Sequence, residues 1–105
     1  MSEARPKQPR PTPIDEALER LLTEPSYAAQ TLIVTARLLE MDAAEPLTPL
    51  ARKHALTIAS DAILAKLPDV VRRDSIDRAL VAMPDLDTIT RGEYALRLRD
   101  AAKSL

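Results

Sequence analysis

The prolines of this chain stand where helices would have to begin or end. Two of them follow a threonine, in Thr12-Pro13 and Thr48-Pro49. A threonine side chain can cap the first backbone N–H groups of a helix, and proline is favoured at the first helical position. Further prolines, which interrupt helices because they lack a backbone N–H, stand at positions 25, 46, 68 and 84. The chain therefore divides into segments of helical length.

What lies between the prolines is poor in aromatic residues. The 105 residues include two Tyr and one Gly, and no Phe, Trp or Cys. Leu, Ala, Ile and Val must therefore make the core. With 46% hydrophobic and 30% charged residues, the composition indicates a globular body rather than a disordered chain. The most β-like run, residues 31–35, lies inside a longer helical pattern, so we predict an all-α fold.

The hydrophobic periodicity predicts a compact bundle of four to five helices, over about residues 12–24, 26–42, 48–67, 69–83 and 90–104. The second is apolar around most of its circumference, from Tyr27 to Met41, so we expect it to be the central helix. Thr90 and Glu93 have the spacing of a capping box. Residues 1–11 carry three prolines and no apolar pattern, which predicts a disordered, basic Pro/Arg-rich arm ahead of a single domain over residues 12–105.

The same periodicity predicts which residues of each helix face the core. In the first helix these are Ile14, Ala17, Leu18, Leu21 and Leu22. In the third they are Ala51, Ala55, Leu56, Ile58, Ala59, Ala62 and Ile63, and in the fourth Ile76, Ala79, Leu80 and Met83. In the last helix they are Tyr94, Leu98, Ala101, Ala102 and Leu105.

The inventory of reactive side chains argues against an enzyme. His54 is the only histidine, on a polar helix face, and a metal site or catalytic dyad would need further ligands or a nucleophile within reach. A single glycine excludes the glycine-rich loops that bind nucleotide phosphates. We therefore predict no catalytic, cofactor or metal residues. The chain has no apolar run of membrane-spanning length and no secretory signal at its start, so we expect a cytoplasmic protein that does not contact membranes.

Protein–protein interaction is the function that this composition favours. Some apolar residues fall outside the expected core stripes, and together they suggest a second layer of helix from this chain or from another copy. The candidate partner-binding residues are Leu50, Leu64, Val70, Val81 and Leu96. We expect a small non-enzymatic interaction module, either a homodimer or an accessory subunit.

The alternative is a DNA- or RNA-binding protein. It would use Arg5, Lys7 and Arg10 of the arm together with Arg72, Arg73, Arg91, Arg97 and Arg99 of the last two helices. Against it stand a net charge of −1 and acidic residues interleaved with the arginines. Gel shifts at low and moderate salt, with and without residues 1–11, separate the two hypotheses, because phosphate-driven binding is strongest at low salt.

Overall fold

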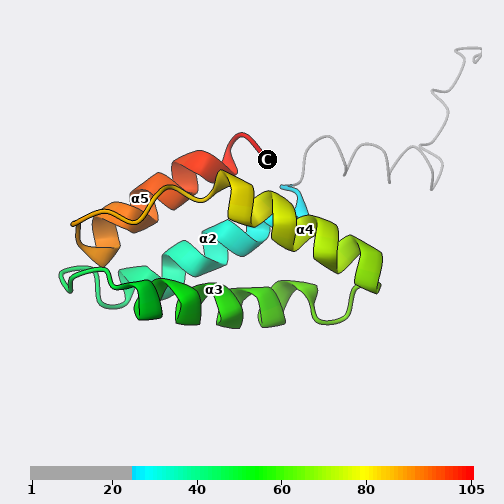
Figure 1. Ribbon diagram of the computed structural model, residues 1–105, viewed down its shortest axis with the longest axis horizontal. Helices are drawn as coiled ribbons and strands as arrows, with labels where there is room; N and C mark the ends of the chain where they lie inside the picture. Colours follow the sequence, from blue (N-terminus) through cyan, green and yellow to red (C-terminus); the bar gives the residue numbers. More distant parts are fainter. Residues whose placement is uncertain (1–24) are drawn as a thin grey trace, which may run out of the picture.

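The structure, a computed structural model, describes residues 25–105, and this part of the chain consists of four helices (Figure 1). They are α2 (Tyr27–Glu40), α3 (Pro49–Leu64), α4 (Asp69–Ala82) and α5 (Arg91–Ala102). Residues 25–105 contain no strand, only an isolated bridge between Pro46 and Thr90. The predicted all-α bundle is confirmed. The predicted arm over residues 1–11 and the helix expected from Thr12-Pro13 lie outside the described residues.

Local capping interactions explain where three of the helices begin. The Ser26 and Thr48 side chains accept hydrogen bonds from the third backbone N–H of α2 and α3, each at 3.1 Å. At α5 the predicted capping box is present, because the Thr90 hydroxyl accepts from the Glu93 N–H and the Glu93 carboxylate accepts from the Thr90 N–H. α4 begins after Pro68 without a side-chain cap, and Asp69 supplies a negative charge in its first turn.

α2 is the central helix, as its broad apolar surface predicts. It packs against all three other helices, most extensively on α5 and α3. Figure 1 shows α2 between α3 and α5, with α4 crossing its N-terminal half. The side that faces these neighbours buries Ala28, Ala29, Leu32, Ala36 and Leu39.

Two threonines complete the buried side of α2, where the sequence pattern would have placed only apolar residues. Thr31 and Thr35 are fully buried, and their hydroxyls donate to the carbonyls of Tyr27 and Thr31 at 2.8 Å. A hydroxyl satisfied in this way within its own helix can be buried at little cost. Tyr27 and Met41, counted with the apolar surface of α2, are instead 46% and 78% exposed.

α3 uses fewer of its apolar residues in packing than the pattern predicts. Ala55 and Ala59 are buried, as expected for alanines that allow helices to approach closely. Ile58 is 45% exposed and Ala62 is also exposed, so the prediction that they face the core is wrong. Ala62 follows the buried Ala55 by two helical turns, so its exposure reflects its place near the C-terminal end of α3 rather than a different side of the helix.

The connections at the two ends of the α3–α4 unit are tied together by backbone hydrogen bonds. The Leu47 N–H donates to the Ile89 carbonyl at 3.0 Å, and the Arg91 N–H donates to the Glu45 carbonyl at 2.9 Å. The Gly92 N–H donates to the Ala43 carbonyl at 2.9 Å. A Cβ at position 92 would lie 3.0 Å from the Ala43 Cβ and 3.2 Å from its oxygen, so the chain's single glycine stands where two backbone segments approach each other closely.

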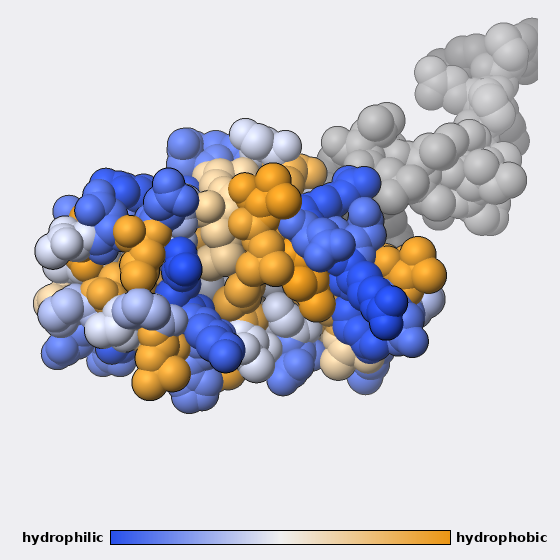
Figure 2. All heavy atoms as spheres, viewed as in Figure 1, coloured by the Kyte–Doolittle hydropathy of each residue, from blue (hydrophilic) through white to orange (hydrophobic). Residues whose placement is uncertain are grey.

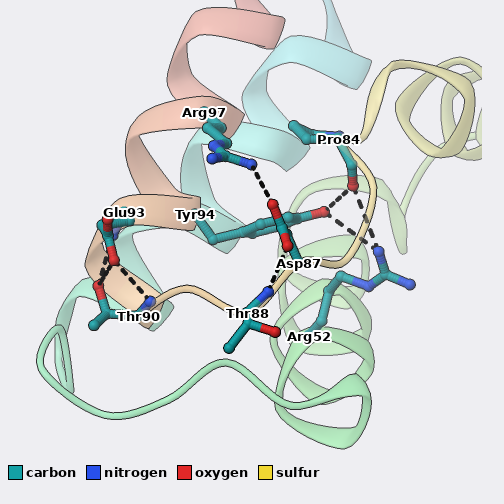
Figure 3. A network of polar contacts seen from close by, with 8 residues as sticks. All are labelled: Arg52, Pro84, Asp87, Thr88, Thr90, Glu93, Tyr94 and Arg97. Atoms are coloured by element: carbon teal, nitrogen blue, oxygen red, sulfur yellow. Dashed lines mark hydrogen bonds and ion pairs between the residues drawn. The ribbon is translucent and has the colours of Figure 1, made fainter.

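Tyr94 joins α5 to the connection between α4 and α5. Its side chain is fully buried, and its hydroxyl donates to the Pro84 carbonyl (Figure 3). The Arg52 guanidinium of α3 lies beside both oxygens, at 3.4 Å from the Tyr94 hydroxyl and 3.5 Å from the Pro84 carbonyl. The predicted inward placement of Tyr94, Leu98 and Ala102 is confirmed.

Candidate interaction surface

α4 presents small residues to the rest of the protein and large apolar residues to solvent. Ser75 and Ala79 are the buried residues of this helix, 6% and 1% exposed. Small side chains of this kind let α4 lie close to its neighbours. Leu80, predicted to face the core, is 51% exposed, so that prediction is wrong: α4 is rotated toward Ser75 and away from the Ile76–Leu80 side.

The outer side of α4 is consequently rich in uncovered apolar surface. Val70 and Val81 are 80% and 88% exposed, and Val71 is 38% exposed. Val70 and Val81 are eleven residues apart, three helical turns, so they lie on one line about 16 Å long. In Figure 2 a hydrophobic band crosses the molecule near the C-terminal end of α4, flanked by hydrophilic surface.

Four of the five candidate partner-binding residues are exposed. Besides Val70 and Val81 of α4, Leu50 of α3 is 76% exposed and Leu96 of α5 is 67% exposed. Leu64 is fully buried, so the expectation that it lies on the surface is wrong. It is the last residue of α3, and four residues separate it from the start of α4.

These exposed residues do not all belong to one patch, because they lie on three different helices. α4 contributes the most, Val70, Val71, Leu80 and Val81, with Val71 and Leu80 on opposite flanks of the line from Val70 to Val81. Sequence analysis singled out Val70 and Val81 but missed Val71 and Leu80. Leu80 was assigned to the core beside Ala79, and the residue that marks the side actually buried is Ser75, four residues before Ala79.

The charged residues on α4 are paired within the helix. Arg72 forms an ion pair with Asp69, and the Arg78 Nε lies 3.0 Å from the Asp74 carboxylate. Both pairs are solvent-exposed and contribute little stability. Their effect is to leave the outer side of α4 with balanced charge around its apolar residues.

The arginines considered for nucleic-acid binding are mostly engaged with carboxylates. Arg91 lies 3.6 Å from Asp42, Arg97 lies 3.8 Å from Asp87, and Arg99 pairs with Glu40. Arg72 is paired on α4, so Arg73 is the one of these five arginines without an ion pair among residues 25–105. Arg5, Lys7 and Arg10 lie outside the described residues. A phosphate would have to compete with these carboxylates, so nucleic-acid binding stays a prediction that the arginine geometry does not favour.

The Glu40–Arg99 pair is the most complete ion pair in the described part of the chain. The Arg99 Nε and Nη2 donate to the two carboxylate oxygens of Glu40 at 3.0 and 2.6 Å, joining α2 to α5. These hydrogen bonds lower the pKa of the Glu40 carboxyl and raise the pKa of the Arg99 guanidinium. Hydrogen bonds from the Thr90 backbone and hydroxyl likewise lower the pKa of Glu93. These pKa shifts therefore come from hydrogen bonds that stabilise the structure, and they do not indicate a site for proton transfer.

The His and acidic side chains of the described residues do not assemble into a metal site. His54 is exposed on α3, and residues 25–105 contain no group of three or more His, Cys, Asp or Glu side chains arranged to hold a metal ion. Among the four described helices, none is both long enough and apolar enough to cross a lipid bilayer.

Comparison of the chain with protein-family models, with curated proteins and with solved structures gave no match. The exposed apolar side of α4 is therefore the feature from which a function has to be argued.

Proposed function

We propose that this protein is a small, non-enzymatic interaction module that forms a homodimer through the outer side of α4. The observation that carries the proposal is the inverted arrangement of this helix. Ser75 and Ala79 are buried against the bundle, whereas Val70, Val71, Leu80 and Val81 are left in solvent.

The exposure of these four residues is costly for a monomer. Moving a Val or Leu side chain from water into an apolar environment is worth about 1.5–3 kcal/mol, so burying several of them together provides a substantial driving force for association. Single exposed apolar residues are common on proteins, but a concentration on one helix is a feature of interaction sites.

A second copy of α4 is a suitable partner for this surface. In an antiparallel pair related by a two-fold axis, Val70 of one copy lies opposite Val81 of the other, and the same contact forms twice. The residues between them, which include the Asp74–Arg78 pair, carry both signs of charge. Two copies can therefore approach without a net repulsion along the helix.

The oligomeric state of the full chain tests the proposal. Size exclusion with light scattering at tens of micromolar should give the mass of a dimer. Val81→Lys should shift it to monomer, because the charge has to be desolvated in the interface. In the monomer the new lysine follows Asp77 at the favourable i,i+4 spacing, so the fold itself should keep its stability.

Leu96→Lys is the matched control, since Leu96 is 67% exposed on α5 and the new lysine would precede Asp100 by four residues. It should leave the dimer intact. A wild-type monomer at this concentration would remove self-association and leave only a heterologous partner, as for an accessory subunit. Equal dissociation by both variants would show that α4 is not the interface.

A further inference from the structure

Not every charged residue of α4 is paired within the helix. Arg73 and Asp77 are both exposed, and neither forms an ion pair with another residue in the 25–105 part of the chain. They stand four residues apart with the base first, which is the less favourable order for a pair along one helix. The other four charged residues of α4 form the pairs Asp69–Arg72 and Asp74–Arg78. One positive and one negative side chain are thus left over on this helix.

The two remaining charges lie on the same flank of the line from Val70 to Val81. Successive residues of a helix turn by about 100°, so Asp77, seven residues after Val70, returns to within about 20° of it. Arg73, three residues after Val70, lies about 60° away in the same direction. Leu80 lies on this flank too, about 80° from Val70. Arg73 and Asp77 therefore border the apolar surface through which self-association is proposed.

One two-fold axis suits both the apolar and the charged residues. An antiparallel pair that sets Val70 opposite Val81 has its axis level with the midpoint of these residues, between positions 75 and 76. The midpoint of Arg73 and Asp77 is position 75. Arg73 of one copy therefore comes level with Asp77 of the other to within one residue, about 1.5 Å along the helix axis. Such an axis also brings the same flank of both helices together, so the opposite charges face each other.

We propose that Arg73 of each protomer forms an ion pair with Asp77 of its partner, and that these two symmetric pairs set the antiparallel direction and the register of the dimer. The contact presupposes the proposed self-association through α4 and determines how the two copies are oriented. A parallel pair would instead bring both copies of Asp77 to the same level near the apolar line, where their charges repel each other.

The ion pair acts on specificity more than on affinity. Exposed ion pairs contribute little free energy, whereas like charges that face each other across an interface are costly. The apolar side chains of α4 can supply most of the driving force in any direction or register. The charges exclude the arrangements in which equal signs meet, and the antiparallel pair with Val70 opposite Val81 satisfies both requirements.

Charge reversal tests the contact in the full chain. Arg73→Glu sets two acidic side chains against each other twice per dimer, and Asp77→Arg does the same with two basic ones. Either variant alone should raise the dissociation constant of the dimer at least about tenfold, measured by sedimentation equilibrium over a concentration series. An equimolar mixture of the two variants should restore the dimer, because opposite charges then meet at both contacts. Recovery in the mixture also shows that both variants are folded.

Lys53→Glu and Asp61→Arg are the matched controls, since they make the same changes of net charge at exposed positions of α3. Alone or mixed, they should leave the dissociation constant unchanged. If Arg73→Glu and Asp77→Arg associate like the wild type while Val81→Lys dissociates the dimer, the α4 interface stands and the ion pair is overturned. A mixture that associates as weakly as its components would also overturn the ion pair. A monomeric wild type would overturn both the ion pair and the proposed function.

Discussion

Tyr94→Phe offers a measurable test of how the only buried aromatic residue within residues 25–105 stabilises the fold. The substitution keeps the ring in its fully buried position and removes the hydroxyl that donates to the Pro84 carbonyl. Leaving a buried carbonyl without a donor costs about 1–3 kcal/mol. Here the lower end applies, because the Pro84 carbonyl is only partly buried and Arg52 still lies 3.5 Å from it.

We therefore expect Tyr94→Phe to reduce the free energy of unfolding by about 1 kcal/mol. For a domain of this size that corresponds to a decrease in Tm of about 4–8 °C. Urea and thermal unfolding followed by circular dichroism at the helical band measure both quantities. Tyr94→Ala should cost much more, about 3–5 kcal/mol, because it also empties the core position.

Tyr27→Phe supplies the matched control, since it makes the same chemical change on a side chain that is 46% exposed. It should leave Tm unchanged within error. If Tyr94→Phe and Tyr27→Phe behave alike, the hydrogen bond to Pro84 contributes nothing to stability. If Tyr94→Phe is as damaging as Tyr94→Ala, the hydroxyl rather than the ring supports the α4–α5 connection.

Two further predictions concern α5. Because Arg99 lowers the pKa of the Glu40 carboxyl in the folded state, the pair stabilises the fold above the ordinary value of 4.5 and this stabilisation is lost as the pH falls through the lowered pKa. The difference in unfolding free energy between the wild type and Glu40→Gln should be about 1 kcal/mol or less at pH 7, because both side chains of the pair are about a third exposed. Acid denaturation should show this difference becoming smaller below about pH 4.5. A difference that grows toward low pH would contradict this sign. Gly92→Ala should lower Tm although alanine is the better helix former by up to about 1 kcal/mol, because its Cβ would lie 3.0 Å from that of Ala43. Adding Ala43→Gly should restore part of the loss, and a Tm increase in Gly92→Ala alone would show that the connection yields at no cost.

The helix starts could be predicted from sequence because capping is local. The Thr48-Pro49 pair and the Thr90–Glu93 box each lie within four residues of chain, and both are formed in the structure. The central position of α2 was also predictable, since no other helix has so wide an apolar surface. These features depend on neighbours in sequence, or on one helix at a time.

The orientation of α4 could not be predicted in the same way. Its sequence offers two overlapping inner sides that share Ala79, one with Ile76 and Leu80 and one with Ser75, and periodicity prefers the larger residues. The choice depends on how closely α4 approaches α2 and α3, and the smaller side wins where space is limited. Leu64 was also misplaced, because it is the last residue of α3, where the chain turns toward α4, and a single helical stripe assigned it to the exposed side.

Arg97 shows the same limit for polar contacts. Its spacing from Glu93 suits a pair within α5, yet Glu93 caps the helix at Thr90 and Arg97 lies 3.8 Å from Asp87 in the preceding connection. Helical spacing identifies which partners are within reach, but not which of them is already engaged.

The backbone hydrogen bonds that join residues 43–47 to residues 89–92 make the α3–α4 unit an anchored insertion. Its entry and its exit are held at one point by main-chain hydrogen bonds, to which the Arg91 side chain adds contacts with the Pro46 carbonyl and Asp42. The ends of α2 and α5 are therefore joined directly at this point, in addition to the packing of α3 and α4 on α2. Substitutions on the outer side of α4 can therefore change that surface while the α2–α5 pair keeps its structure. Gly92 has to be kept, because the backbone hydrogen bonds between residues 43–47 and 89–92 form around it.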